Sequence, residues 1–300
     1  MHITMKTFSV IGFILILFVV GCQQPNAVEV TPDVEEPQLE ITSLAMSDTA
    51  VYAGVDSLAV TPADQDRFAG LLLVNNVRFD GGTRWGVQTV AYSSASVTDR
   101  SRPLELRGKV FGYYGIRLMA QNPLTPVRIN GLAMREKAHR IKAAGVQANF
   151  GYEYDRDIST IYQPDAPFTW TASPDSLGPV QVSIQSPADL TVALPVGGSV
   201  IPRNQDLRLE WKGEGEMLIV LSAHNPLARQ SRPLLKMRPL ANRGHARLSA
   251  AILQALPGER YYVFTFIVAN RKEVRIDRNG ASVLVLAQAA SVHNVYVEFQ

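Results

Sequence analysis

Three acidic residues at alternate positions, Glu153, Asp155 and Asp157, are the best candidates for chemistry in this 300-residue chain. In a strand, side chains two residues apart point to the same side, so these carboxylates would lie on one face. Paired carboxylates can serve as the acid and base of a glycosidase, and grouped carboxylates can bind calcium. A solvated acidic face is the simpler interpretation, because Arg156 interrupts the group and no glycine-containing calcium loop is present.

Histidine and serine positions give little support for metal binding or nucleophilic catalysis. The histidines are scattered singly, without an HxxxH pair or a cysteine partner. The serines in glycine-containing turns lack the Gly-x-Ser-x-Gly spacing of serine hydrolases. We therefore expect no metal, no cofactor and no catalytic residue, which indicates a protein that is not an enzyme.

A basic segment forms a second candidate site, because no acidic residue occurs between Met217 and Gly258. The planar guanidinium of arginine can bind phosphate or carboxylate through two parallel hydrogen bonds. A solvated surface without a role is the simpler interpretation, and an anionic glycan or lipopolysaccharide is the ligand that such a segment would bind. No aromatic residue interleaves the arginines, so nucleic acid is not an expected partner. The candidate anion-binding residues are Arg229, Arg232, Lys236, Arg238, Arg243 and Arg247.

Four aromatic residues are candidates for a third kind of site, a platform on which sugar rings stack. They are Trp85, Tyr113, Tyr114 and Tyr162. Aromatic residues in strands belong more often to the core, so both interpretations stay open.

The start of the chain has the features of an export signal. Lys6 precedes an apolar run from Phe8 to Val20, which has roughly the length of a signal h-region and is shorter than the ~20 residues of a membrane-spanning helix. Gly21 and Cys22, the only cysteine, follow directly. This arrangement resembles the lipobox of bacterial lipoproteins. The resemblance implies removal of residues 1–21, acylation of Cys22 and a firm membrane anchor, because several acyl chains bind far more strongly than one.

Residues 22–44 are expected to form a disordered acidic tether. They contain several acidic residues and prolines and no basic residue, so the segment should be extended and should hold the folded part away from an anionic lipid surface. In a Gram-negative cell, Gln23 after the cysteine resembles lipoproteins sorted to the outer membrane. Which face of that membrane carries the protein stays open.

Beyond the tether, the hydrophobic pattern has a period of two and predicts an all-β fold. Asn130-Gly131 predicts a two-residue hairpin turn, and a helix over 132–144 is the competing interpretation of the same region. The strands expected from the pattern are Gly70 to Val74, Trp85 to Tyr92, Leu104 to Tyr113 and Val180 to Ile184.

Prolines and glycines in residues 173–189 predict a boundary between two tandem β-sandwich domains, 45–178 and 184–300. In the second domain, Trp211 lies in an early alternating strand, and Pro257 precedes Tyr261 by four residues. This pattern resembles fibronectin type III and immunoglobulin-like sandwiches. The resemblance implies that Tyr261 is the corner tyrosine, which hydrogen-bonds the backbone of the preceding turn.

Together these features favour a membrane-anchored envelope lipoprotein of a non-catalytic binding or assembly type. The alternatives are an enzyme acting on envelope polysaccharide through the acidic cluster, and an anionic-glycan binder acting through the basic segment 229–247.

Overall fold

The computed structural model describes residues 39–44, 67–106, 109–119, 126–143, 146–174, 177–228, 230–278 and 281–300. Within these ranges the chain is almost entirely β-structure, so the expected all-β fold is confirmed. The signal segment, Cys22 and most of the tether expected at 22–44 lie outside the described residues. None of the helices in the described ranges is long and apolar enough to cross a membrane.

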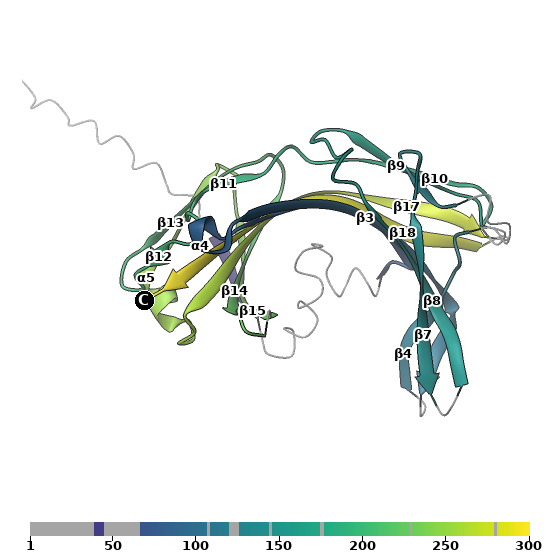
Figure 1. Cartoon of the computed structure of the whole chain (residues 1–300), viewed down its shortest axis with the longest axis horizontal. Helices are drawn as coiled ribbons and strands as arrows, with labels where there is room; N and C mark the ends of the chain where they lie inside the picture. The colour runs from purple at the N-terminus through teal and green to yellow at the C-terminus, as the bar shows by residue number, and fades with distance from the viewer. Residues whose placement is uncertain are drawn as a thin grey trace, which may run out of the picture. The chain divides into compact units, whose positions relative to one another are not determined.

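Most strands belong to one long sheet with the order β1-β15-β14-β17-β18-β2-β3-β8-β7. In addition, β4 pairs with β3, and β12 pairs with β18. The longest strands of this sheet lie side by side (Figure 1), and β18 and β2 pair in parallel over eleven residues. The strands of this sheet are β1 Leu39–Ser43, β2 Gly70–Asp80, β3 Val87–Leu106, β4 Lys109–Gly115, β7 Arg135–Ala143, β8 Val146–Asp157, β12 Val200–Ile201, β14 Met217–Asn225, β15 Gln230–Pro239, β17 Tyr261–Arg278 and β18 Ala281–Phe299.

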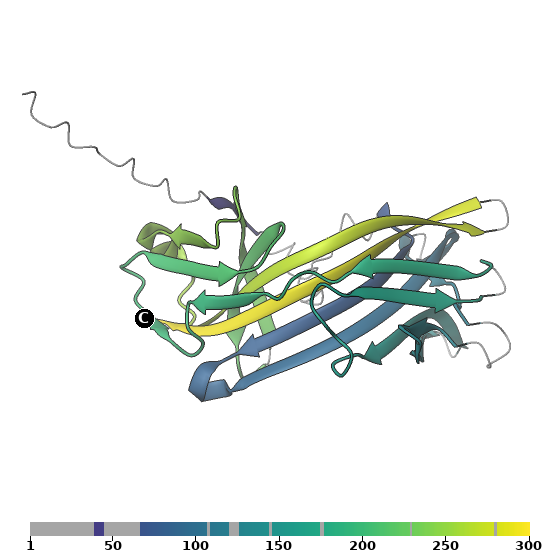
Figure 2. The ribbon, with the colours of Figure 1, turned by 90° about the horizontal axis from the view of Figure 1, so that it is seen from above.

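Two smaller sheets lie across one face of the long sheet, as Figure 2 shows from above. The first has the order β10-β9-β5-β6, and the second has the order β11-β13-β16. Two short helices lie among these described elements. The bounds are β5 Arg128–Ile129, β6 Leu132–Ala133, β9 Pro167–Ala172, β10 Val180–Gln185, β11 Thr191–Leu194, β13 Leu207–Lys212, β16 His245–Leu248, α4 Gly82–Trp85 and α5 Ala250–Ala255.

Each small sheet encloses a separate hydrophobic core against the long sheet. We call the long-sheet face that carries both cores the inner face, and the opposite one the outer face. The first core contains Val285 from β18, and the second contains Val295 from the same strand. β17 likewise places Ile276 in the first core and Phe264 in the second. Residues 184–300, expected as a separate domain, therefore contribute strands to both cores.

The hairpin prediction at Asn130-Gly131 is confirmed. These residues join β5 to β6 with φ of 45° and 81°, and a type I′ turn requires positive φ at both positions. The competing helix over 132–144 is wrong, because Arg135–Ala143 forms β7 and pairs with β8. The strand expected from Leu104 to Tyr113 is divided between β3 and β4, which pair antiparallel.

Near the start of β17, the tyrosine at the turn is Tyr262 and not Tyr261. The Tyr262 hydroxyl donates a hydrogen bond of 2.5 Å to the carbonyl oxygen of Pro257, and its ring is fully buried in the second core. Adjacent residues of a strand face opposite sides, so Tyr261 lies on the outer face. Trp211 is buried in the same core, with its ring centroid 5.9 Å from that of Phe266.

Candidate functional site

The acidic residues on β8 make polar contacts with their neighbours. Asp155 forms ion pairs with Arg135, at 3.4 Å, and with Lys137 on the adjacent strand β7. Asp157 accepts a hydrogen bond of 2.9 Å from the backbone N–H of Ser159, and this bond lowers the pKa of Asp157. A carboxyl with a lowered pKa is a poor general acid at neutral pH. Within the described ranges, no three His, Cys, Asp or Glu side chains are grouped to hold a metal ion.

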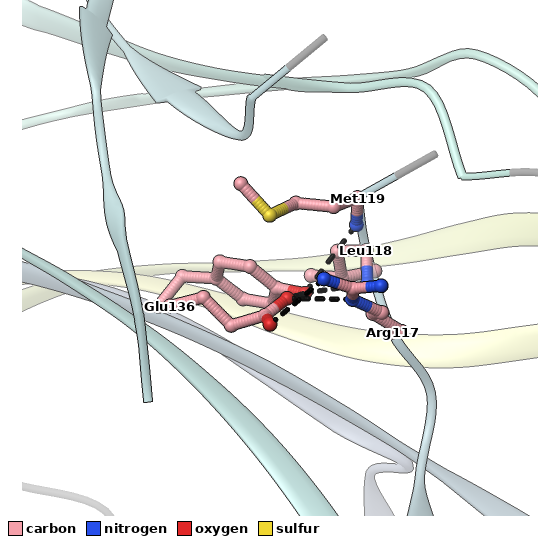
Figure 3. Close-up of polar contacts among 5 residues, drawn as sticks. Arg117, Leu118, Met119 and Glu136 are labelled. Carbon is pink, nitrogen blue, oxygen red and sulfur yellow. Dashed lines mark hydrogen bonds and ion pairs between the residues drawn. The ribbon is translucent and has the colours of Figure 1, made fainter. Parts of the chain in front are cut away.

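A polar network next to this cluster was not expected from the sequence (Figure 3). Arg117 donates two hydrogen bonds to Glu136, of 2.9 and 3.0 Å, and the Tyr154 hydroxyl donates a third of 2.8 Å. The same hydroxyl accepts hydrogen bonds from the backbone N–H groups of Leu118 and Met119. Partial burial opposes ionisation of Glu136, but the bonds from Arg117 and Tyr154 outweigh it and lower the pKa. The network therefore fixes residues 117–119 against β7 and β8.

The basic segment does not form one continuous surface, because a β-bulge divides β15. Leu221 pairs with Leu235, but the next residue, Ser222, pairs with Pro233, so Leu234 is an extra residue. Arg232 therefore stands opposite Ala223, a residue of the second core. Lys236, four residues later, lies on the outer face.

The other basic residues of the segment also occupy different places. Arg232 forms an ion pair of 2.6 Å with Glu259, and Arg238 forms one of 3.2 Å with Glu216. Arg247 lies on β16, in a small sheet, and pairs with Asp206. Arg243 lies in the loop before that strand, and Arg229 is outside the described residues.

The four aromatic residues considered for sugar stacking do not gather either. Tyr113 and Tyr114 lie under separate arginine side chains, Arg100 at 5.4 Å and Arg102 at 4.7 Å. Tyr162 stacks on the core residue Phe168, and burial raises the pKa of its hydroxyl to about 12. Trp85 alone among the four is exposed, at 40% of its surface.

Trp85 belongs instead to an aromatic cluster that forms where β2 turns into β3. Its ring meets Tyr261 edge-on at 5.5 Å and Tyr296 at 5.9 Å. The Arg84 guanidinium lies over both Trp85, at 4.9 Å, and Tyr261, at 5.0 Å. We define the Trp85 surface as Arg84, Trp85, Arg260, Tyr261, Tyr296 and Glu298.

Glu298 holds the two arginines of the Trp85 surface in place. It accepts hydrogen bonds from Arg84 at 3.1 Å and from Arg260 at 2.6 Å, while its own side chain is nearly buried. The hydrogen bond from Arg260 and the charges of both arginines lower the pKa of Glu298. Arg84 also donates a hydrogen bond of 2.8 Å to the Tyr261 hydroxyl. Two cations and one anion leave this surface with a net positive charge.

The conformation of the turn between β2 and β3 explains why the Trp85 side chain is exposed. Gly82 has φ of +58°, and a Cβ there would collide with the backbone oxygen of Gly197, so the turn requires glycine. The Asp80 carboxylate accepts the backbone N–H of Gly82 at 3.0 Å and fixes the start of α4. The sequence named Trp85 as a candidate for sugar stacking, but its partners, Tyr261 and Tyr296, lie over 170 residues away.

No family model matches the chain, and the comparison with curated proteins finds no match.

Proposed function

We propose that this chain is a lipid-anchored envelope protein that binds an acidic glycan through the Trp85 surface and does no chemistry on it. The observation that carries the proposal is the exposed Trp85 ring, held edge-on by two tyrosines and flanked by arginine. Aromatic rings offer flat apolar faces to sugars, and guanidinium groups bind carboxylates through two hydrogen bonds.

The composition of the Trp85 surface favours binding over a structural role alone. Tryptophan, tyrosine and arginine are the residues in which binding energy concentrates at interfaces. Here the rings of Trp85 and Tyr261 pack against each other, and Glu298 holds Arg84 and Arg260 by hydrogen bonds. Little conformational entropy is therefore lost when a ligand binds. A rigid, positively charged aromatic surface fits a glycan that carries carboxylates.

For the fold, we propose that the second core belongs to an immunoglobulin-like sandwich. Two features support this: the buried Trp211 and the hydrogen bond from Tyr262 to the turn at Pro257. The first core, with its share of β17 and β18, would be a second sandwich joined to it through these strands.

The anchor proposal rests on the apolar run and the small residue before Cys22. Cells that express the chain are labelled with an alkyne-bearing fatty acid. The wild type should take up label and fractionate with membranes, and Cys22→Ser should take up none. Equal labelling of both would contradict an anchor at Cys22.

The binding proposal is tested with the full chain in neutral detergent, titrated with polygalacturonate as an acidic glycan and with dextran as a neutral one. Trp85→Ala should weaken polygalacturonate binding about tenfold, since a central tryptophan contributes more than 1 kcal/mol. The matched control is Leu240→Ala, which removes a side chain that is 66% exposed and follows the end of β15 that is remote from Tyr261. Unchanged binding by Trp85→Ala, or equal binding of dextran, would contradict the proposal.

A further inference from the structure

A half-buried histidine, His224, adjoins the Trp85 surface near the end of β14. Its ring meets the ring of Tyr296 edge-on, with the two centroids 5.2 Å apart. The Trp85 centroid lies 5.9 Å from the same tyrosine ring, so the Trp85 and His224 rings can be no farther apart than these two distances combined. A ligand that covers Trp85 and extends across Tyr296 therefore reaches His224.

The strand register also places His224 beside the Trp85 surface. Ala223 pairs with Tyr262, so the next residue, His224, stands beside Tyr261 on the outer face. On the other side, His224 pairs with Ser231 of β15, and its Nδ1 lies 3.0 Å from the Ser231 hydroxyl oxygen. Among the described residues nothing hydrogen-bonds the other ring nitrogen, Nε2, which leaves it available to a carboxylate of a ligand.

The charged groups on the outer face around His224 keep their charge between pH 7.5 and pH 5.5. The guanidinium groups of Arg84 and Arg260 are cationic throughout. Glu298 is held by these two arginines, which lower its pKa, so it stays anionic. Burial raises the pKa of the Tyr296 hydroxyl, which stays neutral. Within the described part of this region, His224 is thus the side chain whose charge can change over this range.

The remaining charged groups near His224 face away from it. Arg232 follows Ser231 on β15, stands opposite Ala223, and pairs with Glu259 at 2.6 Å. Because Ala223 belongs to the second core, this ion pair lies toward the inner face. It leaves the outer face, where a ligand would lie, with His224 and the Trp85 surface.

The protonation of His224 is linked to the binding of an anion. Burial lowers the pKa of His224 below its ordinary value of about 6.5, so the ring is neutral at pH 7.5 in the free protein. A ligand carboxylate beside the ring would favour the charged form and raise that pKa. A ligand that raises the pKa of a group binds more tightly at a pH where the group is protonated.

We propose that His224 is part of the glycan site and takes up a proton when an acidic glycan binds at the Trp85 surface. Binding therefore strengthens as the pH falls from 7.5 to 5.5. The proton comes from the solvent, and the imidazolium then faces a glycan carboxylate. This inference rests on the proposed function, because only a ligand with carboxylates draws the proton onto the ring. A neutral glycan would bind with the same affinity at both pH values.

The test measures the dissociation constant of polygalacturonate at pH 7.5 and pH 5.5, with the full chain in neutral detergent at one ionic strength. The ligand carboxylates are ionised at both values, because an ordinary carboxyl has a pKa of about 4. The wild type should bind about three- to tenfold more tightly at pH 5.5, tenfold being the limit when binding raises the pKa of His224 by one unit. His224→Gln should have the same dissociation constant at both pH values.

Two further histidine variants are the controls. His245→Gln changes a histidine of β16, in the second small sheet, and should keep the ratio of the wild type. His293→Asn tests another route, because His293 Nε2 lies 3.8 Å from Asp80, which fixes the start of α4. This variant should also keep the ratio of the wild type. The folded state of each variant is checked by urea unfolding at both pH values.

A direct measurement follows the proton itself. In protein labelled with ¹³C-histidine, the His224 signal is the one missing from the NMR spectrum of His224→Gln. Its pKa should rise when polygalacturonate is added and should stay unchanged with dextran.

The possible results separate this inference from the proposed function. If polygalacturonate binds in a manner that depends on Trp85 but with the same affinity at both pH values, the proposed function stands and the role of His224 is wrong. The role is also wrong if His224→Gln keeps the ratio of the wild type, or if His293→Asn loses it. Absence of binding at both pH values would contradict the proposed function and this inference together.

Discussion

The Tyr262 hydroxyl lies 2.5 Å from the carbonyl oxygen of Pro257, to which it donates a hydrogen bond. The ring is fully buried, and Arg203 donates a further bond of 3.3 Å to the same hydroxyl. Tyr262→Phe leaves the ring packing intact but removes the partner of the Pro257 carbonyl, whereas Arg203 keeps its hydrogen bond to the carbonyl of Glu259. We expect the free energy of unfolding to fall by about 1–3 kcal/mol, the cost of unsatisfied buried polar groups. Urea unfolding measures this difference.

The control for that prediction is the neighbouring Tyr261→Phe. Tyr261 accepts its hydrogen bond from Arg84 at the surface, so its loss should change stability by less than about 0.5 kcal/mol. A larger loss of stability in Tyr261→Phe than in Tyr262→Phe would contradict the assignment of the hydrogen bond at the turn to Tyr262.

The Tyr261 and Tyr262 pair also shows what alternation in a sequence can and cannot predict. It predicts that the two tyrosines face opposite sides of a strand, which the structure confirms. It does not say which side is the core, because that depends on the strands on either side of β17. The sequence therefore predicted the fold class and the strand. The resemblance, however, gave the hydrogen bond at the turn to Tyr261, whereas Tyr262 makes it.

The bulge at Leu234 limits prediction of the candidate sites in the same way. Arg232 and Lys236 have the same parity in the sequence and would share a face in a regular strand. The extra residue reverses this relation, and Pro233 beside it is a local signal, because proline within a strand occurs at bulges and edges. Likewise, Trp85 was identified as a candidate from the sequence, whereas Tyr296 was not, because contacts between distant strands leave no local signal.

The network around Glu136 predicts a dependence of stability on pH. The pKa of Glu136 in the folded protein is lowered. Its contribution to the free energy of unfolding is therefore complete above the ordinary pKa of about 4.3, and it is lost as the pH falls through the folded pKa. Glu136→Gln should lower the free energy of unfolding by about 1 kcal/mol at pH 7, and the difference from the wild type should shrink at pH 3. Urea unfolding at both values checks this.

A matched control for the Glu136 experiment is Glu273→Gln. Glu273 pairs with Arg67, but both side chains are largely exposed, so the change should be below about 0.5 kcal/mol at either pH. A difference between the wild type and Glu136→Gln that stays constant from pH 7 to pH 3 would contradict the role given to its charge.

Replacement of the buried Asn75 is expected to stabilise the protein. Its side chain is fully buried on β2, and neither amide atom has a hydrogen-bond partner. Asn75→Leu, which has a similar shape, should raise the free energy of unfolding by about 1–3 kcal/mol by removing two unsatisfied groups. Asn294→Leu is the matched control, because Asn294 accepts a hydrogen bond of 2.7 Å from Thr265 and its loss should destabilise. Changes of the same sign in both variants would contradict this interpretation.

His293, at 1% exposure, is one of the groups expected to make stability depend on pH between pH 7.5 and pH 5.5. Burial and the charge of Arg78 lower its pKa, and its Nδ1 accepts the backbone N–H of Val192 at 3.1 Å. As the pH falls below about 6.5, the unfolded chain binds a proton that the folded chain does not, so stability falls.

We therefore expect the wild type to lose stability over this range, by at most about 1.4 kcal/mol per pH unit from this group. His293→Asn keeps an acceptor for Val192 but cannot be protonated, so its free energy of unfolding should depend less on pH. Asp80 lies 3.8 Å from Nε2 and favours the opposite result. If the Asp80 carboxylate stabilised a charged imidazole, the wild type would gain stability on acidification, and urea unfolding at the two pH values would show it directly.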